Sequence, residues 1–113
     1  MISKAKSKYI RISPYKLRPL VDVIRGSSVD RAYNWLKTCS VKRVEPIIKT
    51  LFSAYSNAKN KHADISAMSD LVIKEIRVDQ GPTVTYFKPA AMGRAAAQRK
   101  KMCHLEIILD KKS

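Results

Sequence analysis

The 113-residue sequence contains little glycine and little cysteine, and each shortage excludes a class of protein. Three well-separated glycines cannot build the glycine-rich loop that holds the phosphates of a nucleotide. Two cysteines, Cys39 and Cys103, are too few for a disulfide scaffold, so we expect reduced thiols packed as small apolar residues. The apolar runs fall far short of the ~20 residues of a membrane-spanning helix, and no signal peptide precedes them. We therefore expect one cytosolic domain over residues 1–113.

Acidic residues are also scarce, nine against 23 lysines and arginines, which gives a formal net charge of +14. This charge repels itself in the free protein and becomes favourable against a polyanion, with nucleic acid as the first candidate and an anionic membrane surface as the second. Two acid-free blocks, residues 1–21 and 81–105, contain eleven of the cations: Lys4, Lys6, Lys8, Arg11, Lys16, Arg18, Lys88, Arg94, Arg99, Lys100 and Lys101. Residues 22–80 are nearly balanced. The pattern predicts a nearly neutral body with two cationic extensions, and a solvated lysine-rich surface is the alternative.

Three stretches have the apolar spacing of helices, namely residues 13–25, 28–37 and 40–61. Each begins with a serine at a position suited to an N-cap. Pro19 lies inside the first stretch, so we expect that helix to be kinked or to begin later. Pro46 suggests the same choice, a bend or a later start, for the third.

Residues 8–12, 71–78 and 102–109 alternate in polarity or are rich in β-branched residues, which is typical of strands. With the helices on one face, they predict an α+β fold with a small three-stranded antiparallel sheet.

Residues 81–101 join two of these strands, contain no acid, and have no row of large apolar residues. The median connection in compact domains is ~4–6 residues long, so a connection of ~20 residues indicates a function. We expect a protruding β-hairpin with limbs of ~10 residues, reaching ~33 Å, and a tip at residues 89–93. The body then comprises about residues 8–80 and 102–110, with a basic N-terminal segment at 1–8.

The histidines and cysteines lack the spacing of metal ligands. Cys103 and His104 are adjacent, whereas Cys39 and His62 are remote from them and from each other. On a strand, one of the adjacent pair faces the core and the other faces solvent. We expect no metal and no cofactor.

Two other functions remain as alternatives. The acidic pattern of a Mg²⁺-dependent nuclease is faintly resembled by Asp64 or Asp70 followed by Glu75 and Arg77, although Arg77 replaces the usual lysine. Glu75 and Arg77 on one strand face are also typical of an exposed ion pair. Three closely spaced helices also suggest a sequence-specific DNA-binding helix-turn-helix protein. The third helix is the longest and most apolar, which favours a core helix instead. We expect no enzyme activity.

Four blocks resemble, in order, the motifs of one known family. The stretch Leu17–Gly26, with the lysine before it, is similar to K-x-R-x-x-x-D-x-I-R-G, and residues 53–58 are similar to S-A-x-x-N-A. Residues 78–82 resemble V-D-x-G-P, and residues 89–95 resemble P-R-A-x-G-R-A. The family is the L twenty-two type of large-subunit ribosomal protein. The blocks span nearly the whole chain and are specific in combination.

The resemblance implies a small α+β body on the surface of the large ribosomal subunit, near the exit of the nascent chain, and a hairpin that follows the exit tunnel through ribosomal RNA. It implies three kinds of partner: large-subunit rRNA, neighbouring large-subunit proteins and the nascent polypeptide. It also implies support of subunit assembly and a place on cytoplasmic or organellar ribosomes. Arg25 joins the eleven cations above as an expected rRNA-binding residue. The tip that helps to form the narrow part of the tunnel is Pro89, Ala90, Ala91, Met92, Gly93 and Arg94.

The sequence departs from the family pattern at four positions. Ala90 replaces the usual arginine after the tip proline, Thr85 and Tyr86 replace basic residues, and Pro19 replaces an aliphatic residue. We therefore expect the tip to hold RNA less through charge. Tyr86 and Phe87 either stack on bases or pair across the ribbon.

Overall fold

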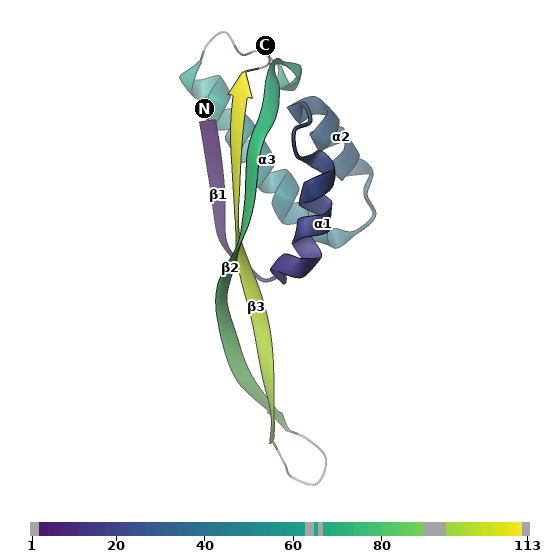
Figure 1. Cartoon of the computed structure of the whole chain (residues 1–113), viewed down its shortest axis with the longest axis vertical. Coiled ribbons are helices and arrows are strands. Elements are labelled where there is room, and N and C mark those ends of the chain that lie inside the picture. Colours follow the sequence, from purple (N-terminus) through teal and green to yellow (C-terminus); the bar gives the residue numbers. More distant parts are fainter. Residues whose placement is uncertain (1–2, 63–64, 66, 90–94, 112–113) are drawn as a thin grey trace.

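The computed structural model of the chain describes residues 3–62, 65, 67–89 and 95–111, with the backbone alone described at 84–89 and 95–100. The helices lie against one face of an antiparallel sheet, which confirms the predicted α+β fold (Figure 1). In chain order the elements are β1 (Ser3–Ile10), α1 (Pro14–Ile24), α2 (Val29–Thr38), a 3₁₀ turn (Lys42–Val44), α3 (Glu45–Lys61), a 3₁₀ turn (Met68–Asp70), β2 (Leu71–Pro89) and β3 (Ala95–Lys111).

The sheet has the order β1-β3-β2, so β3 is central and both other strands are edges. The strand expected at residues 8–12 lies earlier, because β1 runs from Ser3, opposite Leu109, to Ile10, opposite Cys103. Most of the predicted basic N-terminal segment is therefore part of the sheet. The inward-facing residues of β1 are small, which is why its first half gives no hydrophobic signal.

Hydrogen bonds hold β1 to α3. The Ser3 hydroxyl donates to the Ala54 carbonyl at 2.8 Å, and the hydroxyls of Ser7 and Thr50 lie 2.7 Å apart. The core between helices and sheet is otherwise apolar. Its largest fully buried side chains are Leu17, Val21, Ile24, Leu36, Ile47, Leu51, Leu71, Ile73, Ile76, Leu105, Ile107 and Leu109.

The two prolines act differently in their helices. Helix α1 begins at Pro14 with Ser13 as its N-cap and continues through Pro19, so the expected later start is wrong. Pro19 is exposed, and because proline has no backbone N–H, the helix loses one hydrogen bond to the preceding turn at this position. Helix α3 begins at Glu45, after a 3₁₀ turn, so the later start predicted from Pro46 is confirmed.

Beyond the body, β2 and β3 continue as a twisted two-stranded ribbon, paired from Thr83↔Lys101 to Pro89↔Ala95 (Figure 1). We call residues 83–89 and 95–101 the arm. The molecule extends 64 Å along its longest axis, and its radius of gyration of 17.2 Å exceeds the about 13 Å of a compact chain of this length. Of the expected tip, Pro89 is the last paired residue of β2, and residues 90–94 lie outside the described residues.

The register shifts between Gln80 and Thr83, where the ribbon leaves the body. Pro82 cannot donate to a ladder, so it fits only at such an irregularity or on an edge. Gly81 is required by close approach, because a Cβ there would lie 3.2 Å from the Met102 carbonyl carbon and oxygen. No helix in the described part of the chain is long and apolar enough to cross a membrane.

Candidate nucleic-acid interface

Three predicted cations lie along β1. Lys4, Lys6 and Lys8 are exposed and alternate with the small residues that face α3. The side chain of Asn57 on α3 donates to the Lys4 carbonyl at 3.1 Å, which fixes the strand that bears these lysines. Pairing of β1 with β3 thus places a row of ammonium groups at one edge of the sheet.

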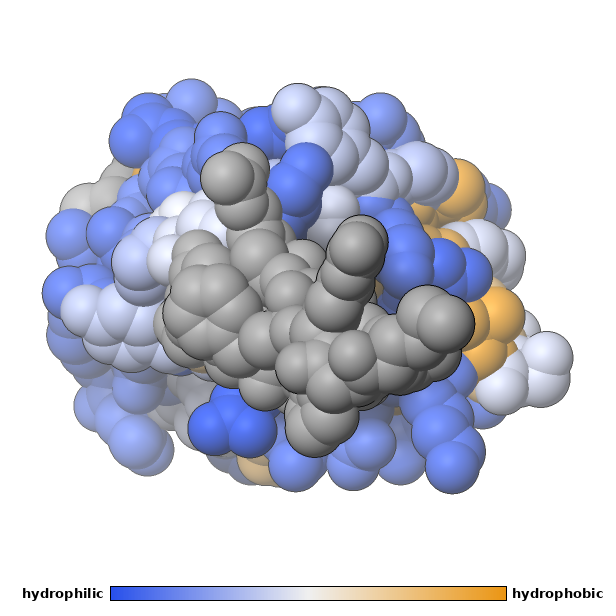
Figure 2. All heavy atoms as spheres, turned by 90° about the horizontal axis from the view of Figure 1, so that it is seen from below, coloured by the Kyte–Doolittle hydropathy of each residue, from blue (hydrophilic) through white to orange (hydrophobic). Residues whose placement is uncertain are grey.

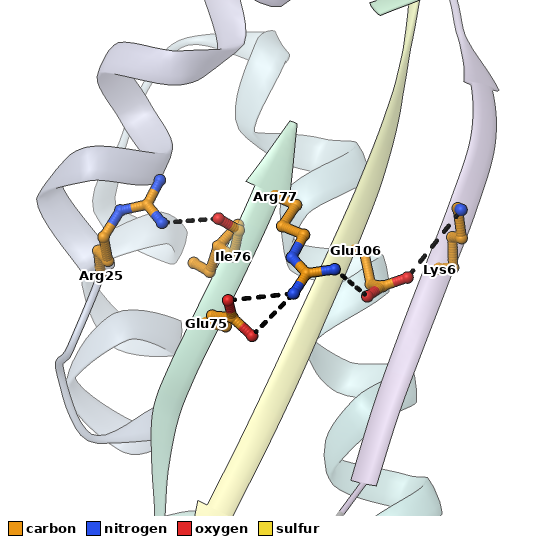
Figure 3. Close-up of polar contacts among 6 residues, drawn as sticks. All are labelled: Lys6, Arg25, Glu75, Ile76, Arg77 and Glu106. Atoms are coloured by element: carbon orange, nitrogen blue, oxygen red, sulfur yellow. Dashed lines mark hydrogen bonds and ion pairs between the residues drawn. The ribbon is translucent and has the colours of Figure 1, made fainter. Parts of the chain in front are cut away.

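The centre of the outer sheet face is ion-paired rather than cationic. Glu106 on β3 lies between Lys6 on β1, at 4.0 Å, and Arg77 on β2, at 3.9 Å (Figure 3). Arg77 also contacts Glu75 at 3.2 Å. The hydrogen bond to Glu75, and then the charge of that carboxylate, raise the pKa of the Arg77 guanidinium. This face therefore carries little free positive charge away from the lysines at its edge.

The same pairing involves two residues of the nuclease alternative. Glu75 contacts Arg77, and Asp70 lies in the 3₁₀ turn before β2. Asp64 lies outside the described residues. Across residues 3–62, 65, 67–89 and 95–111, no three His, Cys, Asp or Glu side chains gather into a metal site.

Cys103, on the central strand β3, is fully buried, whereas Cys39 is half-buried. Burial raises the pKa of the Cys103 thiol, partly offset by the charge of Arg18. The thiol therefore stays protonated at neutral pH and packs as a small apolar group, as predicted from the sequence.

Two of the predicted RNA-binding arginines contact the protein itself. Arg18 donates to the Val78 carbonyl at 3.1 Å. Arg25 donates to the Ile76 carbonyl at 2.6 Å (Figure 3). Both carbonyls belong to β2, an edge strand whose polar groups would otherwise be open to another chain. Arg25 also pairs with Asp22 at 3.3 Å. These contacts join α1 to β2 and leave part of each guanidinium exposed.

Cations from both acid-free blocks meet where the arm leaves the body. The Arg18 guanidinium and the Lys101 ammonium lie 5.7 and 5.2 Å from the centroid of the Tyr15 ring, within the range of cation–π attraction. Tyr15 itself is 65% exposed. We call the exposed cations of this region the collar: Lys8, Arg11, Lys16, Arg18 and Lys101. Figure 2 views the molecule from the arm end, and hydrophilic residues dominate the surface around the arm.

The arm backbone places the remaining cations along its two strands. Lys88 lies opposite Ala96, Arg99 opposite Thr85 and Lys100 opposite Val84. Tyr86 and Phe87 lie opposite Gln98 and Ala97, so the ribbon does not set the two aromatic residues directly across from each other. Arg94 lies outside the described residues, as does the tip from Ala90 onward.

Tyr15 and Tyr9 were not among the predicted site residues. The signal for Tyr15 is its position three residues before Arg18, because residues at that spacing share one side of a helix. Tyr9 lies in an irregular part of β1, between Ser7 and Ile10, and the alternating pattern of the sequence does not indicate this irregularity.

Comparison with known proteins covers nearly the whole chain. The sequence model of the family described as ribosomal protein L22p/L17e matches residues 5–110. The large ribosomal subunit protein uL22 of Desulfitobacterium hafniense strain Y51 is 43% identical over 111 residues, covering 97% of this chain and 95% of the relative. That of Syntrophus aciditrophicus strain SB is 44% identical over 113 residues, covering 99% and 100%. Protein uL22c of Chlorokybus atmophyticus is 41% identical over 107 residues, covering 95% and 88%.

Proposed function

This chain belongs to the ribosomal protein L22p/L17e family of the large ribosomal subunit, and from this membership we propose how it acts there. It binds large-subunit rRNA through the collar and the arm, supports subunit assembly, and lines the nascent-chain exit tunnel with the arm. Its role is structural rather than catalytic. As a ribosomal protein it is cytoplasmic in a bacterium, and neighbouring large-subunit proteins and the nascent polypeptide are its further partners.

The observation that carries the proposal is the arm, with the collar at its root. The arm pairs seven residues of β2 with seven of β3, from Thr83↔Lys101 to Pro89↔Ala95, which is a length of ~23 Å at ~3.3 Å per residue. A two-stranded ribbon is marginally stable alone in water. An external partner that neutralises its cations would therefore stabilise it. Phosphates of RNA fit this role, because cations that replace their counterions gain affinity in a salt-dependent way.

The body and the arm divide the work. We propose that the body, about residues 8–80 and 102–110, folds by itself and docks on the subunit surface, while residues 81–101 enter the RNA. The ion pairs around Glu106 suit a solvent-facing sheet, and the bonds from Arg18 and Arg25 protect the β2 edge. Lys4 extends the cationic surface along β1 beyond Lys8 of the collar.

The test compares two variants with the same change of charge. Lys16→Gln with Lys101→Gln removes two collar cations, and Lys59→Gln with Lys61→Gln removes two exposed lysines from the far end of α3, away from the arm (Figure 1). Binding to a large-subunit rRNA transcript is measured by filter binding between 50 and 400 mM KCl. The Debye length falls about threefold over this range.

Each lost phosphate contact makes the slope of log K against log [salt] less negative by about 0.7–0.9. We expect the collar variant to bind more weakly, with a slope that is less negative by about 1.5. The control variant should stay close to wild type. Equal losses in both variants would show diffuse attraction to the whole surface and contradict the proposed interface. Tighter binding to one DNA duplex than to rRNA at raised salt would favour the DNA-binding alternative.

A further inference from the structure

We propose that the ring of Tyr9 is a nucleobase-stacking site at the root of the arm, held in place by its backbone and by His104. The ligand is an unpaired base of RNA. This inference deepens the proposed rRNA binding and rests on it, and it assigns one contact that depends on stacking rather than on charge.

The first observation is backbone strain. Tyr9 has a φ of +60°, which makes it the one residue other than glycine with positive φ in the described part of the chain. It lies where the pairing of β1 with β3 becomes irregular, between Ser7 and Ile10. A bulky L-residue is disfavoured in this region, and glycine or asparagine would adopt it more easily. Strain of this kind persists where the surroundings fix it, and it clusters at functional sites.

The second observation is that burial does not compensate for the strain. Tyr9 is 61% exposed, so its ring gains little from the core. Its compensation comes instead from His104 on β3. The Tyr9 backbone N–H donates to the His104 Nδ1 at 3.1 Å, and the two rings meet at 88° with centroids 5.1 Å apart. An accepting Nδ1 means that the neutral imidazole carries its proton on Nε2.

A third segment completes the support of the ring. A Cβ added at Gly81 would lie 3.3 Å from the His104 Cε1, so glycine at this position leaves the space that the imidazole occupies. Segments from β1, β2 and β3 thus fix one exposed aromatic ring. A ring fixed in advance loses less conformational entropy when it binds.

The surroundings of the ring favour a nucleic acid base as its ligand. Lys8 and Arg11, both exposed, lie on either side of Tyr9 in the chain and belong to the collar. Exposed aromatic rings beside cations are the means by which proteins bind single-stranded RNA, since every base has a face that can stack and phosphates lie close to it. An apolar protein segment would gain nothing from these cations.

The molecule contains a matched control in Phe52. This ring is 48% exposed on α3, and it packs against Tyr33 and Tyr55 with centroid distances of 6.4 and 6.1 Å. A substitution of Phe52 therefore shows the effect of losing an exposed aromatic ring from the helical layer, away from the root of the arm.

The experiment measures thermal unfolding and binding to a large-subunit rRNA transcript for wild type, Tyr9→Asn, Tyr9→Phe and Phe52→Asn. Asparagine accepts the left-handed conformation, so Tyr9→Asn is expected to keep or raise the unfolding midpoint while it weakens rRNA binding about tenfold. The salt slope should stay unchanged, because no phosphate contact is removed. Tyr9→Phe retains the stacking face and should bind like wild type, as should Phe52→Asn. Ultraviolet cross-linking of the wild-type complex, followed by mass spectrometry, should find a nucleotide on the Tyr9 peptide.

The outcomes separate this inference from the proposed function. Wild-type affinity in Tyr9→Asn refutes the stacking site alone, and so does a fall in its unfolding midpoint that matches its loss of binding. Failure of the wild-type protein to bind the rRNA refutes the proposed function instead.

Discussion

Replacing residues 84–100 by the dipeptide Asn-Gly removes most of the arm and tests whether the body folds without it. Thr83 and Lys101 lie opposite each other in the ladder, so a two-residue turn can join them without a change of register. Asn-Gly is the preferred pair for a type I′ turn, whose twist matches that of the strands. The change deletes Lys88, Arg94, Arg99 and Lys100 and lowers the formal net charge by four from +14.

The structure predicts a small effect on stability. All twelve of the largest fully buried side chains described lie outside residues 84–100, so the variant retains this apolar core. The variant loses six cross-strand pairs, each contributing ~0.2–1 kcal/mol. A two-stranded ribbon is marginally stable alone in water, so the conformational entropy that the deleted residues no longer lose offsets the lost pairs. Removal of four like charges also reduces self-repulsion.

We therefore expect a cooperative thermal transition, followed by circular dichroism, with a midpoint within about 5 °C of wild type, since ~1 kcal/mol corresponds to ~4–8 °C in a domain of this size. Urea unfolding at 25 °C provides the second measurement and should give a single transition. A broad, non-cooperative transition, or a protein that fails to fold, would refute the division into a self-folding body and an arm.

Three further predictions concern the body. Leu51→Ala, at a fully buried position, should lower the free energy of unfolding by ~2–5 kcal/mol in urea titrations, and a change below ~1 kcal/mol would contradict the described core. Arg25→Lys keeps the charge but loses the 2.6 Å bond to the Ile76 carbonyl, so it should lower stability by ~1 kcal/mol while leaving the salt slope of rRNA binding unchanged. Wild-type stability of Arg25→Lys would contradict a structural role for this bond. Burial raises the pKa of the Cys103 thiol, so its contribution to stability is complete below the ~8.5 of an unfolded thiol and is lost as the pH rises above that value. Urea titrations at pH 7 and 9.5 should show this loss of stability in wild type but not in Cys103→Ala. Cys39 should react with a thiol reagent before Cys103 does, and equal reaction rates would contradict the burial of Cys103.

The fold class and the arm were predictable because they depend on local patterns. The helical spacing of apolar residues indicated three helices, and the change of pattern at Leu71, with alternation from Ile73, indicated strands. The arm was indicated by a long acid-free connection. The position of β1 was not predictable, because Ser3 and Ser7 face inward as polar residues and form hydrogen bonds to α3, and a hydrophobic pattern does not record such contacts.

The charges of the candidate site were predictable, but the partners of those charges were not. Arg18 and Arg25 contact carbonyls of β2 only because the strand order makes β2 an edge, and strand order depends on the packing of the whole sheet. Lys6 shares Glu106 with Arg77 through the register of three strands. The strained backbone of Tyr9 likewise follows from an irregular pairing of distant segments.

The proposed function requires a self-folding body that uses its cationic arm to bind large-subunit rRNA. The most direct test is sedimentation of large subunits reconstituted with either the wild-type protein or the Asn-Gly variant, through sucrose gradients at low and raised salt. We expect the wild-type protein to stay with the subunits at both salt concentrations and the armless protein to dissociate at the higher one. Equal retention of both proteins at raised salt would contradict the proposed function.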